Sequence, residues 1–216
     1  MWLELVLLVV IALVVSVTVK TFVVQMFFVP SESMEPLFVD NDRILVQKVS
    51  YWGNDVQRGD VVVFEDPGGW LGPNPPLNPF QKVLSTVGLY PTGGHLVKRV
   101  IGVGGDRVQC CDKQGRVTVN DVPLDESDYI MSGAQPSSKP FDVRVPDGRL
   151  WVMGDNRANS EDSRYHQNLR GHGTIPVSSV VGKVFAIVWP LGRFHIVTRP
   201  DTFDQAALQK DPLSRG

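Results

Sequence analysis

The chain has 216 residues, a formal net charge of -2 at pH 7 and 43% hydrophobic residues. This length is enough for one domain with an ordinary core and a small subdomain. The near-neutral charge gives no support to nucleic-acid binding, which usually requires a basic patch, so we expect no nucleic acid among the partners. Abundant glycine and proline, with few helical patterns after residue 30, favour a mostly β fold.

The N-terminal segment is apolar or weakly polar over residues 5–19 and is bounded by Glu4 and Lys20. A helix over this run would be roughly 22 Å long, which is less than the ~30 Å hydrocarbon core of a bilayer. Lys20 can extend its amine towards the surface, and apolar residues continue to Phe28, so we predict one spanning helix that ends at about residues 25–28. A cleaved signal peptide fits less well, because the run has no basic start and no small-x-small site after it.

Two serines follow this run in the segment Pro30-Ser31-Glu32-Ser33-Met34-Glu35-Pro36. Proline restricts its own φ and moves the residue before it out of the helical region, so we expect an extended segment that ends the helix. In an extended segment Ser31 and Ser33 share a face. Two such hydroxyls suit a nucleophile and an oxyanion donor; the alternative is a polar loop that only leaves a membrane helix.

The chain after this junction alternates strands with turns. We predict a strand at 42–49, a strand at 61–64 that is buried on both faces, and strands at 150–153 and 180–189. Residues 107–148 are interpreted as a β subdomain, whose first part is a hairpin with its turn at Asn120-Asp121.

The remaining segments are interpreted from composition. Residues 65–95 are rich in proline, glycine and asparagine and predict an inserted loop, with a short helix at 81–89. Whether the apolar side chains of this insertion contact lipid or the domain stays open. We therefore divide the chain into an anchor at 1–28, a domain at 29–200 and a flexible tail at 201–216.

Lys98 lies in a predicted strand, on the same face as the apolar residues Leu96 and Val100. Only about one free lysine in a few thousand is neutral at pH 7, but burial beside apolar side chains lowers the pKa and favours the neutral amine. A neutral lysine can activate a serine hydroxyl, whereas arginine keeps its proton in proteins. The alternative is a partly exposed strand lysine with no chemical role.

Histidine is the other base that could activate a serine, and the chain has four histidines: His95, His166, His172 and His195. None lies in a recognisable triad context, and the Gly-x-Ser-x-Gly motif is absent from the sequence. Each is therefore interpreted as a surface residue.

The two cysteines are adjacent, at Cys110 and Cys111. They lack the spacing and the partners of a zinc site. A disulfide between neighbours and two free thiols both stay open at this point.

Four segments together resemble the bacterial type I signal peptidases. They occur in order over roughly residues 5–190: the Pro30–Pro36 segment after the apolar run, Arg58–Phe64, Lys98–Asp106 and Gly154–Arg164. The adjacent cysteines and the long insertion before Lys98 are similar to the actinobacterial branch of this family. The resemblance implies a signal-peptidase-like β-barrel or sheet domain after one N-terminal transmembrane helix.

The resemblance also implies a Ser/Lys dyad and assigns roles to single residues. These are Ser33 as nucleophile, Lys98 as general base, the Ser31 hydroxyl and the Ser33 N–H as oxyanion hole, Ser160 as the residue that orients the lysine amine, and Asp162 with Arg164 as a supporting pair. No metal and no organic cofactor is implied. Glu32 departs from the family pattern, in which glycine or another small residue is frequent.

The substrates implied by the resemblance are preproteins that carry a signal peptide, cut after a small-x-small pattern such as Ala-x-Ala. The implied location is the cell membrane, with a single span and the catalytic domain on the extracytoplasmic side. The lipid bilayer is then a partner, and the protein-export machinery is a further possible partner. The positive-inside rule would place the side that carries Lys20 in the cytoplasm, which is opposite to this orientation. Lys20 is the single residue on which that argument depends.

Two other functions compete with this interpretation. A self-cleaving Ser/Lys repressor or mutagenesis protein is disfavoured by the apolar run and by the lack of a DNA-binding helical domain in the sequence. An anchored β domain that binds an extracytoplasmic partner without catalysis is disfavoured because Ser33 and Lys98 are both present.

Overall fold

A computed structural model describes residues 2, 4–12, 23–48, 51, 55–72 and 94–209 of the chain. Residues 2 and 4–12 are helical, and within the described ranges no helix has the length and apolar character needed to cross a bilayer. Part of the predicted anchor at 1–28 lies outside the described residues. Its predicted end is wrong, because Val24–Phe28 form strand β1 and not the last turns of a helix.

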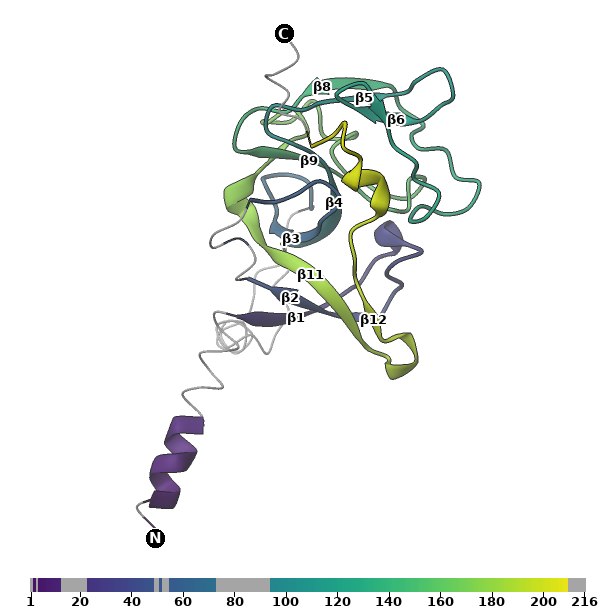
Figure 1. Cartoon of the computed structure of the whole chain (residues 1–216). Helices are drawn as coiled ribbons and strands as arrows, with labels where there is room; N and C mark the ends of the chain where they lie inside the picture. Colours follow the sequence, from purple (N-terminus) through teal and green to yellow (C-terminus); the bar gives the residue numbers. More distant parts are fainter. Residues whose placement is uncertain are drawn as a thin grey trace.

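The described residues form a main sheet of eight strands and a second sheet of four. The main sheet has the order β1-β2-β11-β3-β4-β9-β10, with β12 paired to β11, and its pairings are antiparallel. Its strands are β1 (Val24–Phe28), β2 (Arg43–Gln47), β3 (Val61–Glu65), β4 (His95–Val103), β9 (Arg149–Met153), β10 (Ile175–Pro176), β11 (Val180–Trp189) and β12 (His195–Ile196). The long strand β11 runs between β2 and β3 and joins the two halves of this sheet (Figure 1).

The second sheet is antiparallel and has the order β7-β6-β5-β8, at the opposite end of the body from β1 and β2 (Figure 1). Its strands are β5 (Arg107–Cys110), β6 (Val117–Val119), β7 (Val122–Pro123) and β8 (Phe141–Arg144). The predicted turn is confirmed: Asn120 and Asp121 join β6 to β7 with φ of 52° and 63°, which suits the right-handed twist of a tight hairpin.

Strand β3 confirms the prediction of a strand buried on both faces. Val61 and Val63 pack into one apolar cluster, whereas Val62 and Phe64 pack into another on the opposite face. This alternation follows from the period of two along a strand, and the position of β3 between β11 and β4 covers both of its edges. The strand that carries Lys98 is therefore held against a rigid neighbour.

The segment after Pro200 is packed and not loose, so the predicted flexible tail is wrong for residues 201–209. A 3-10 helix, η5 (Asp201–Asp204), places Phe203 in the core beneath the second sheet, and Leu208 joins the same cluster. Each of these two side chains is 1% exposed. Residues 210–216 lie outside the described residues.

Part of the predicted insertion is described. Trp70 is buried, stacks on His166 with ring centroids 4.4 Å apart, and meets the edge of Phe64. This apolar side chain of the insertion therefore contacts the domain itself. Residues 73–93, which include the predicted helix at 81–89, lie outside the described part of the chain.

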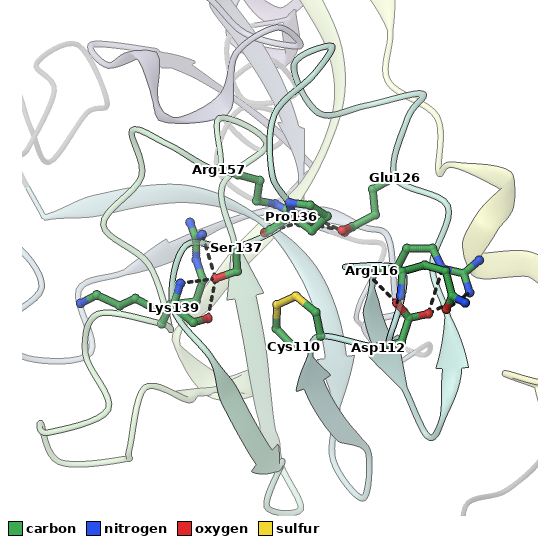
Figure 2. Close-up of a disulfide and its surroundings, with 11 residues drawn as sticks. Cys110, Asp112, Arg116, Glu126, Pro136, Ser137, Lys139 and Arg157 are labelled. Carbon is green, nitrogen blue, oxygen red and sulfur yellow. Dashed lines mark hydrogen bonds and ion pairs between the residues drawn. A yellow bond between two sulfur atoms is a disulfide. The ribbon is translucent and has the colours of Figure 1, made fainter.

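The two cysteines form a disulfide between neighbours, Cys110–Cys111, at the end of β5 (Figure 2). Of the two alternatives, the structure contains the disulfide and not two free thiols. Cys110 also packs against the core of the second sheet.

Candidate active site

Ser33 and Lys98 are brought together from segments that lie far apart in the sequence. Ser33 belongs to the 3-10 helix η1 (Glu32–Met34), and Lys98 lies in the middle of β4. The Lys98 Nζ donates a hydrogen bond of 2.7 Å to the Ser33 Oγ. The two residues that the resemblance assigned to a dyad are thus in direct contact.

The local sequence explains how η1 holds Ser33 in place. Met34 is 1% exposed and belongs to the same apolar cluster as Val29 and Phe38, so the turn is anchored to the core. The Glu35 N–H donates to the Glu32 carbonyl at 3.1 Å and closes the turn. The prediction of a continuously extended segment is wrong for these residues, although Ser31 itself is extended.

The two serine hydroxyls nevertheless lie side by side, as expected. The Ser31 Oγ is 3.3 Å from the Ser33 Oγ. A hydroxyl at this position can rotate to donate to a second oxygen, which is what an oxyanion donor must do.

The environment of Lys98 favours its neutral form. The side chain is 4% exposed, and burial lowers its pKa to about 8, while Asp162 and Asp155 act in the opposite direction and Arg164 adds to the lowering. An amine with this pKa is about one-tenth neutral at pH 7, several hundred times the neutral fraction of a free lysine. The amine can therefore accept a proton from the hydroxyl that it contacts.

The loop from Gly154 to Arg164 docks directly onto η1. The Asn156 N–H donates to the Ser33 carbonyl at 3.2 Å, and the Asn156 side chain donates to the Glu32 carbonyl at 3.1 Å. A Cβ on Gly154 would collide with the Ser33 carbonyl oxygen and with the Ser160 hydroxyl. Glycine is therefore required here for close approach. Sequence reasoning assigned no role to Gly154 or Asn156, although both belong to the motif.

Ser160 lies in this loop and is buried, but its hydroxyl has no hydrogen-bond partner among the described residues. The predicted hydrogen bond to the Lys98 amine is therefore not formed in this state. A buried hydroxyl without a partner is costly, so Ser160 adds no hydrogen bond to the stability of the fold in this state.

Asp162 and Arg164 form the expected pair. The Arg164 Nε and Nη2 each donate to the Asp162 carboxylate at 2.8 Å, and both side chains are fully buried. Asp162 also accepts a hydrogen bond of 2.9 Å from the Gly154 N–H, so the pair holds both ends of the loop together.

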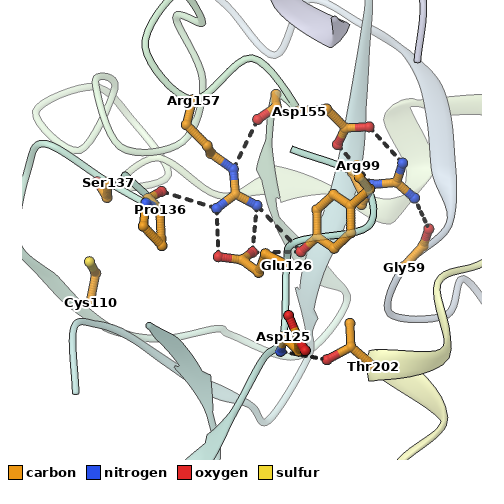
Figure 3. Close-up of polar contacts among 12 residues, drawn as sticks. Gly59, Arg99, Cys110, Asp125, Glu126, Pro136, Ser137, Asp155, Arg157 and Thr202 are labelled. Carbon is orange, nitrogen blue, oxygen red and sulfur yellow. Dashed lines mark hydrogen bonds and ion pairs between the residues drawn. The ribbon is translucent and has the colours of Figure 1, made fainter. Parts of the chain in front are cut away.

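Two further buried ion pairs support the site, and sequence reasoning missed both (Figure 3). Arg99, which points to the opposite side of β4 from Lys98, donates to Asp155 at 2.8 and 2.6 Å and to the Gly59 carbonyl at 2.9 Å. Burial by itself would lower the pKa of the Arg99 guanidinium. The negative charge of Asp155 and its hydrogen bonds act in the opposite direction, and the net effect is a raised pKa. The strand alternation did indicate a second face for Arg99, but not its partner.

The second pair joins the loop to the β subdomain. Arg157 donates to both Glu126 oxygens, at 2.6 and 2.9 Å, and to the carbonyls of Gly154 and Pro136 at 3.1 and 3.0 Å (Figure 3). The Tyr129 hydroxyl donates to the same carboxylate at 2.5 Å. The subdomain at 107–148 therefore braces the loop that contacts Ser33.

Among the described residues, no group of three or more His, Cys, Asp or Glu side chains is arranged to hold a metal ion.

Comparisons with known proteins agree on one family. The family model described as "Signal peptidase, peptidase S26" matches residues 2–189. The chain is 42% identical to Signal peptidase I of Mycobacterium tuberculosis over 220 residues, which covers 90% of this chain and 74% of that protein. It is 40% identical to Probable signal peptidase I of Mycobacterium leprae over 225 residues, covering 88% of this chain and 77% of that protein.

A more distant relative and a solved structure are also similar. Probable signal peptidase I-2 of Synechocystis is 36% identical over 211 residues, covering 98% of this chain and 83% of that protein. A crystal structure of a signal peptidase I from Enterococcus faecalis matches with 23% identity and a TM-score of 0.39, covering 60% of this chain and 97% of that one. On the family match and the mycobacterial identities, the chain belongs to the signal peptidase family, peptidase S26, as an enzyme of the signal peptidase I type.

Proposed function

We propose that this enzyme removes N-terminal signal peptides from secreted preproteins by a Ser/Lys dyad acyl-enzyme mechanism. The observation that carries the proposal is the 2.7 Å hydrogen bond between the buried Lys98 amine and the Ser33 hydroxyl. A lysine whose pKa is lowered by burial and that touches a serine is suited to act as the base that activates the hydroxyl.

In the first half of the reaction, the neutral Lys98 amine accepts the proton of the Ser33 hydroxyl while the oxygen attacks the carbonyl carbon of the scissile bond. The negative charge that develops on the carbonyl oxygen is stabilised by the Ser33 N–H and the Ser31 hydroxyl. The bond to the leaving nitrogen then breaks, and the Lys98 ammonium returns its proton to that nitrogen.

In the second half, the signal peptide is esterified to Ser33 and the mature protein has left. The neutral Lys98 amine takes a proton from a water molecule, whose oxygen attacks the ester carbon. The Ser33 oxygen leaves and recovers the proton from Lys98, so the signal peptide is released as a carboxylic acid, which then loses its proton to the solvent. One water molecule is consumed for each bond that is cut.

We infer the substrates to be preproteins with a small-x-small site next to an apolar segment, and the working place to be a membrane surface. Exposed apolar side chains support contact with lipid. They lie on β1, which pairs with β2, and on β11, β12 and the turn between these two: Met26, Phe28, Trp189, Leu191, Phe194 and Ile196. Large apolar side chains exposed on neighbouring strands are typical of a membrane or protein contact.

The proposed location is the cell membrane, with a single N-terminal span and the domain on the extracytoplasmic side. There the membrane would hold enzyme and substrate in one plane and raise their effective concentration. Protease added to intact, wall-stripped cells should digest the domain, whereas full protection would refute this topology.

The mechanism is tested with the purified full chain in detergent and a preprotein whose signal peptide ends in Ala-x-Ala. Ser33→Ala and Lys98→Ala should each abolish processing while the thermal unfolding transition remains. Turnover in either variant would reject the dyad, whereas a wild-type chain that processes no preprotein would favour the non-catalytic binding domain. Lys113→Ala, which removes a lysine from the second-sheet region, is the matched control and should process normally.

A further inference from the structure

We propose that Glu32 is a specificity-determining residue, which favours substrates with a basic side chain within two residues of the cleaved bond and disfavours acidic ones. The inference rests on the proposed function, because it concerns the same site. It does not depend on how Lys98 is activated.

The position of Glu32 in the chain places its charge at the reacting groups. Glu32 lies between Ser31 and Ser33, whose hydroxyls are 3.3 Å apart. Its side chain is exposed, whereas Met34 of the same turn is buried, so the carboxylate lies on the side of η1 that a substrate can reach.

The carboxylate is held in one place and does not sample the full space of a surface glutamate. The Asn159 side-chain amide donates to the Glu32 Oε2 at 3.1 Å. Asn159 is itself fixed, because its N–H donates to the Asn156 carbonyl at 3.1 Å and to the Asn156 side-chain oxygen at 3.2 Å.

The backbone of Glu32 is fixed by the same loop. Asn156 donates to the Glu32 carbonyl at 3.1 Å through its side chain and to the Ser33 carbonyl at 3.2 Å through its N–H. The loop thus holds the nucleophile turn and the carboxylate together as one unit. A carboxylate restrained in this way loses little further side-chain entropy when a cation approaches.

A fixed negative charge beside the reacting groups acts on substrate charges over several ångströms. A lysine on either side of the scissile bond would be attracted to Glu32, and a glutamate at the same position would be repelled. The effect would weaken at high salt, because exposed charges are screened with a Debye length of about 10 Å at 0.1 M ionic strength.

The test uses two peptide pairs with an Ala-x-Ala site, identical except for one residue that is Lys in one member and Glu in the other. In one pair this residue is the x of the site, and in the other it is the first residue after the cut. The full-length enzyme in detergent should cleave the Lys peptide of at least one pair with a kcat/KM about tenfold higher at low salt. Glu32→Gln should bring that ratio close to one.

Control variants separate a local charge effect from a general one. Asp40→Asn removes an exposed carboxylate from the same segment, and the Lys-to-Glu ratio should stay at the wild-type value. Asn159→Ala should lower the ratio in the wild type but leave it unchanged in the Glu32→Gln background, because its role is to hold Glu32. An equal loss in both backgrounds would overturn the positioning role of Asn159.

Failure of this inference differs from failure of the proposed function. A Lys-to-Glu ratio that is the same in wild type and Glu32→Gln would overturn the specificity role, while cleavage that depends on Ser33 would still support the proposed function. Cleavage that persists in Ser33→Ala would remove the proposed function itself, and the inference with it.

Discussion

Gly154 packs so closely against the carbonyl group of Ser33 that a single methyl group on Gly154 would overlap with the carbonyl oxygen. The same methyl group would overlap with the Ser160 hydroxyl. The turn that carries Ser33 and the loop that carries Ser160 therefore meet at a position where only glycine fits.

We expect Gly154→Ala to reduce processing by at least tenfold, because the Ser33 turn must move away from Lys98. The same overlap should lower the free energy of unfolding by about 1–3 kcal/mol, which is usual for overpacking a buried site. Peptide cleavage and urea denaturation would measure the two effects. Gly72→Ala is the matched control, since a methyl group there meets open space and should change neither quantity. Wild-type kinetics for Gly154→Ala would show that the close approach is irrelevant to catalysis.

The pH dependence of activity follows from the Lys98 amine. Burial lowers its pKa to about 8, and the neutral form is the one that accepts the Ser33 proton. The kcat/KM should therefore rise about tenfold per pH unit below this pKa and level off above it. A peptide substrate without titratable groups between pH 6 and 10 isolates this effect. A rate that is constant from pH 6 to pH 9 would contradict a lysine base.

The same group should make stability depend on pH. Because the folded-state pKa of about 8 lies below the ordinary lysine pKa of 10.5, the unfolded chain binds more protons than the folded protein between these pH values. The free energy of unfolding should then rise with pH across this window, by roughly 3 kcal/mol in total. Lys98→Met keeps the apolar stem and removes the charge, so it should be more stable than wild type below pH 8, with the difference shrinking towards pH 10.5. Denaturation curves of both proteins at several pH values measure this change. A free energy of unfolding that has the same pH dependence in both proteins would contradict the prediction.

Ser160→Ala should separate turnover from stability. The Ser160 hydroxyl is buried without a partner among the described residues, so its removal should leave the free energy of unfolding within about 1 kcal/mol of wild type. We expect kcat to fall with little change in KM. Once Ser33 is esterified, its oxygen no longer pairs with the Lys98 amine, and the Ser160 hydroxyl would then orient this amine. An unchanged kcat would remove Ser160 from the site.

Breaking the pair between Glu126 and Arg157 should destabilise the protein and loosen the loop. Both side chains are almost fully buried, so Glu126→Ala leaves an uncompensated guanidinium in the core and should cost about 3–5 kcal/mol. Asp142→Ala breaks an exposed pair with Arg107 and should have little effect on stability. Urea denaturation of the two variants compares them directly, and equal losses would contradict this role of burial.

Local patterns in the sequence were enough for several elements of the fold. The four apolar residues Val61–Phe64 predict a strand buried on both faces, and β3 is such a strand in the centre of the sheet. Asn120-Asp121 predicts a hairpin turn, because these residues tolerate the left-handed region better than most. In both cases the signal depends only on neighbours in the chain.

The candidate site was predictable because its members lie in short motifs. The resemblance placed Ser33, Lys98 and the Asp162–Arg164 pair in one site, and the structure brings the first two into contact and pairs the last two. The resemblance did not predict that the Ser160 hydroxyl has no partner among the described residues, since the partner of a hydroxyl depends on small displacements of its neighbours.

Only the tertiary structure decided the remainder. An apolar run such as Val24–Phe28 fits the end of a helix as well as a strand, and its pairing with β2 makes it β1. Phe203 is buried because the second sheet offers it a core, and Glu126 is matched to Arg157 across 31 residues of chain. Sequence patterns determine which residues can be buried or paired, whereas the partner is chosen by segments that become neighbours only after folding.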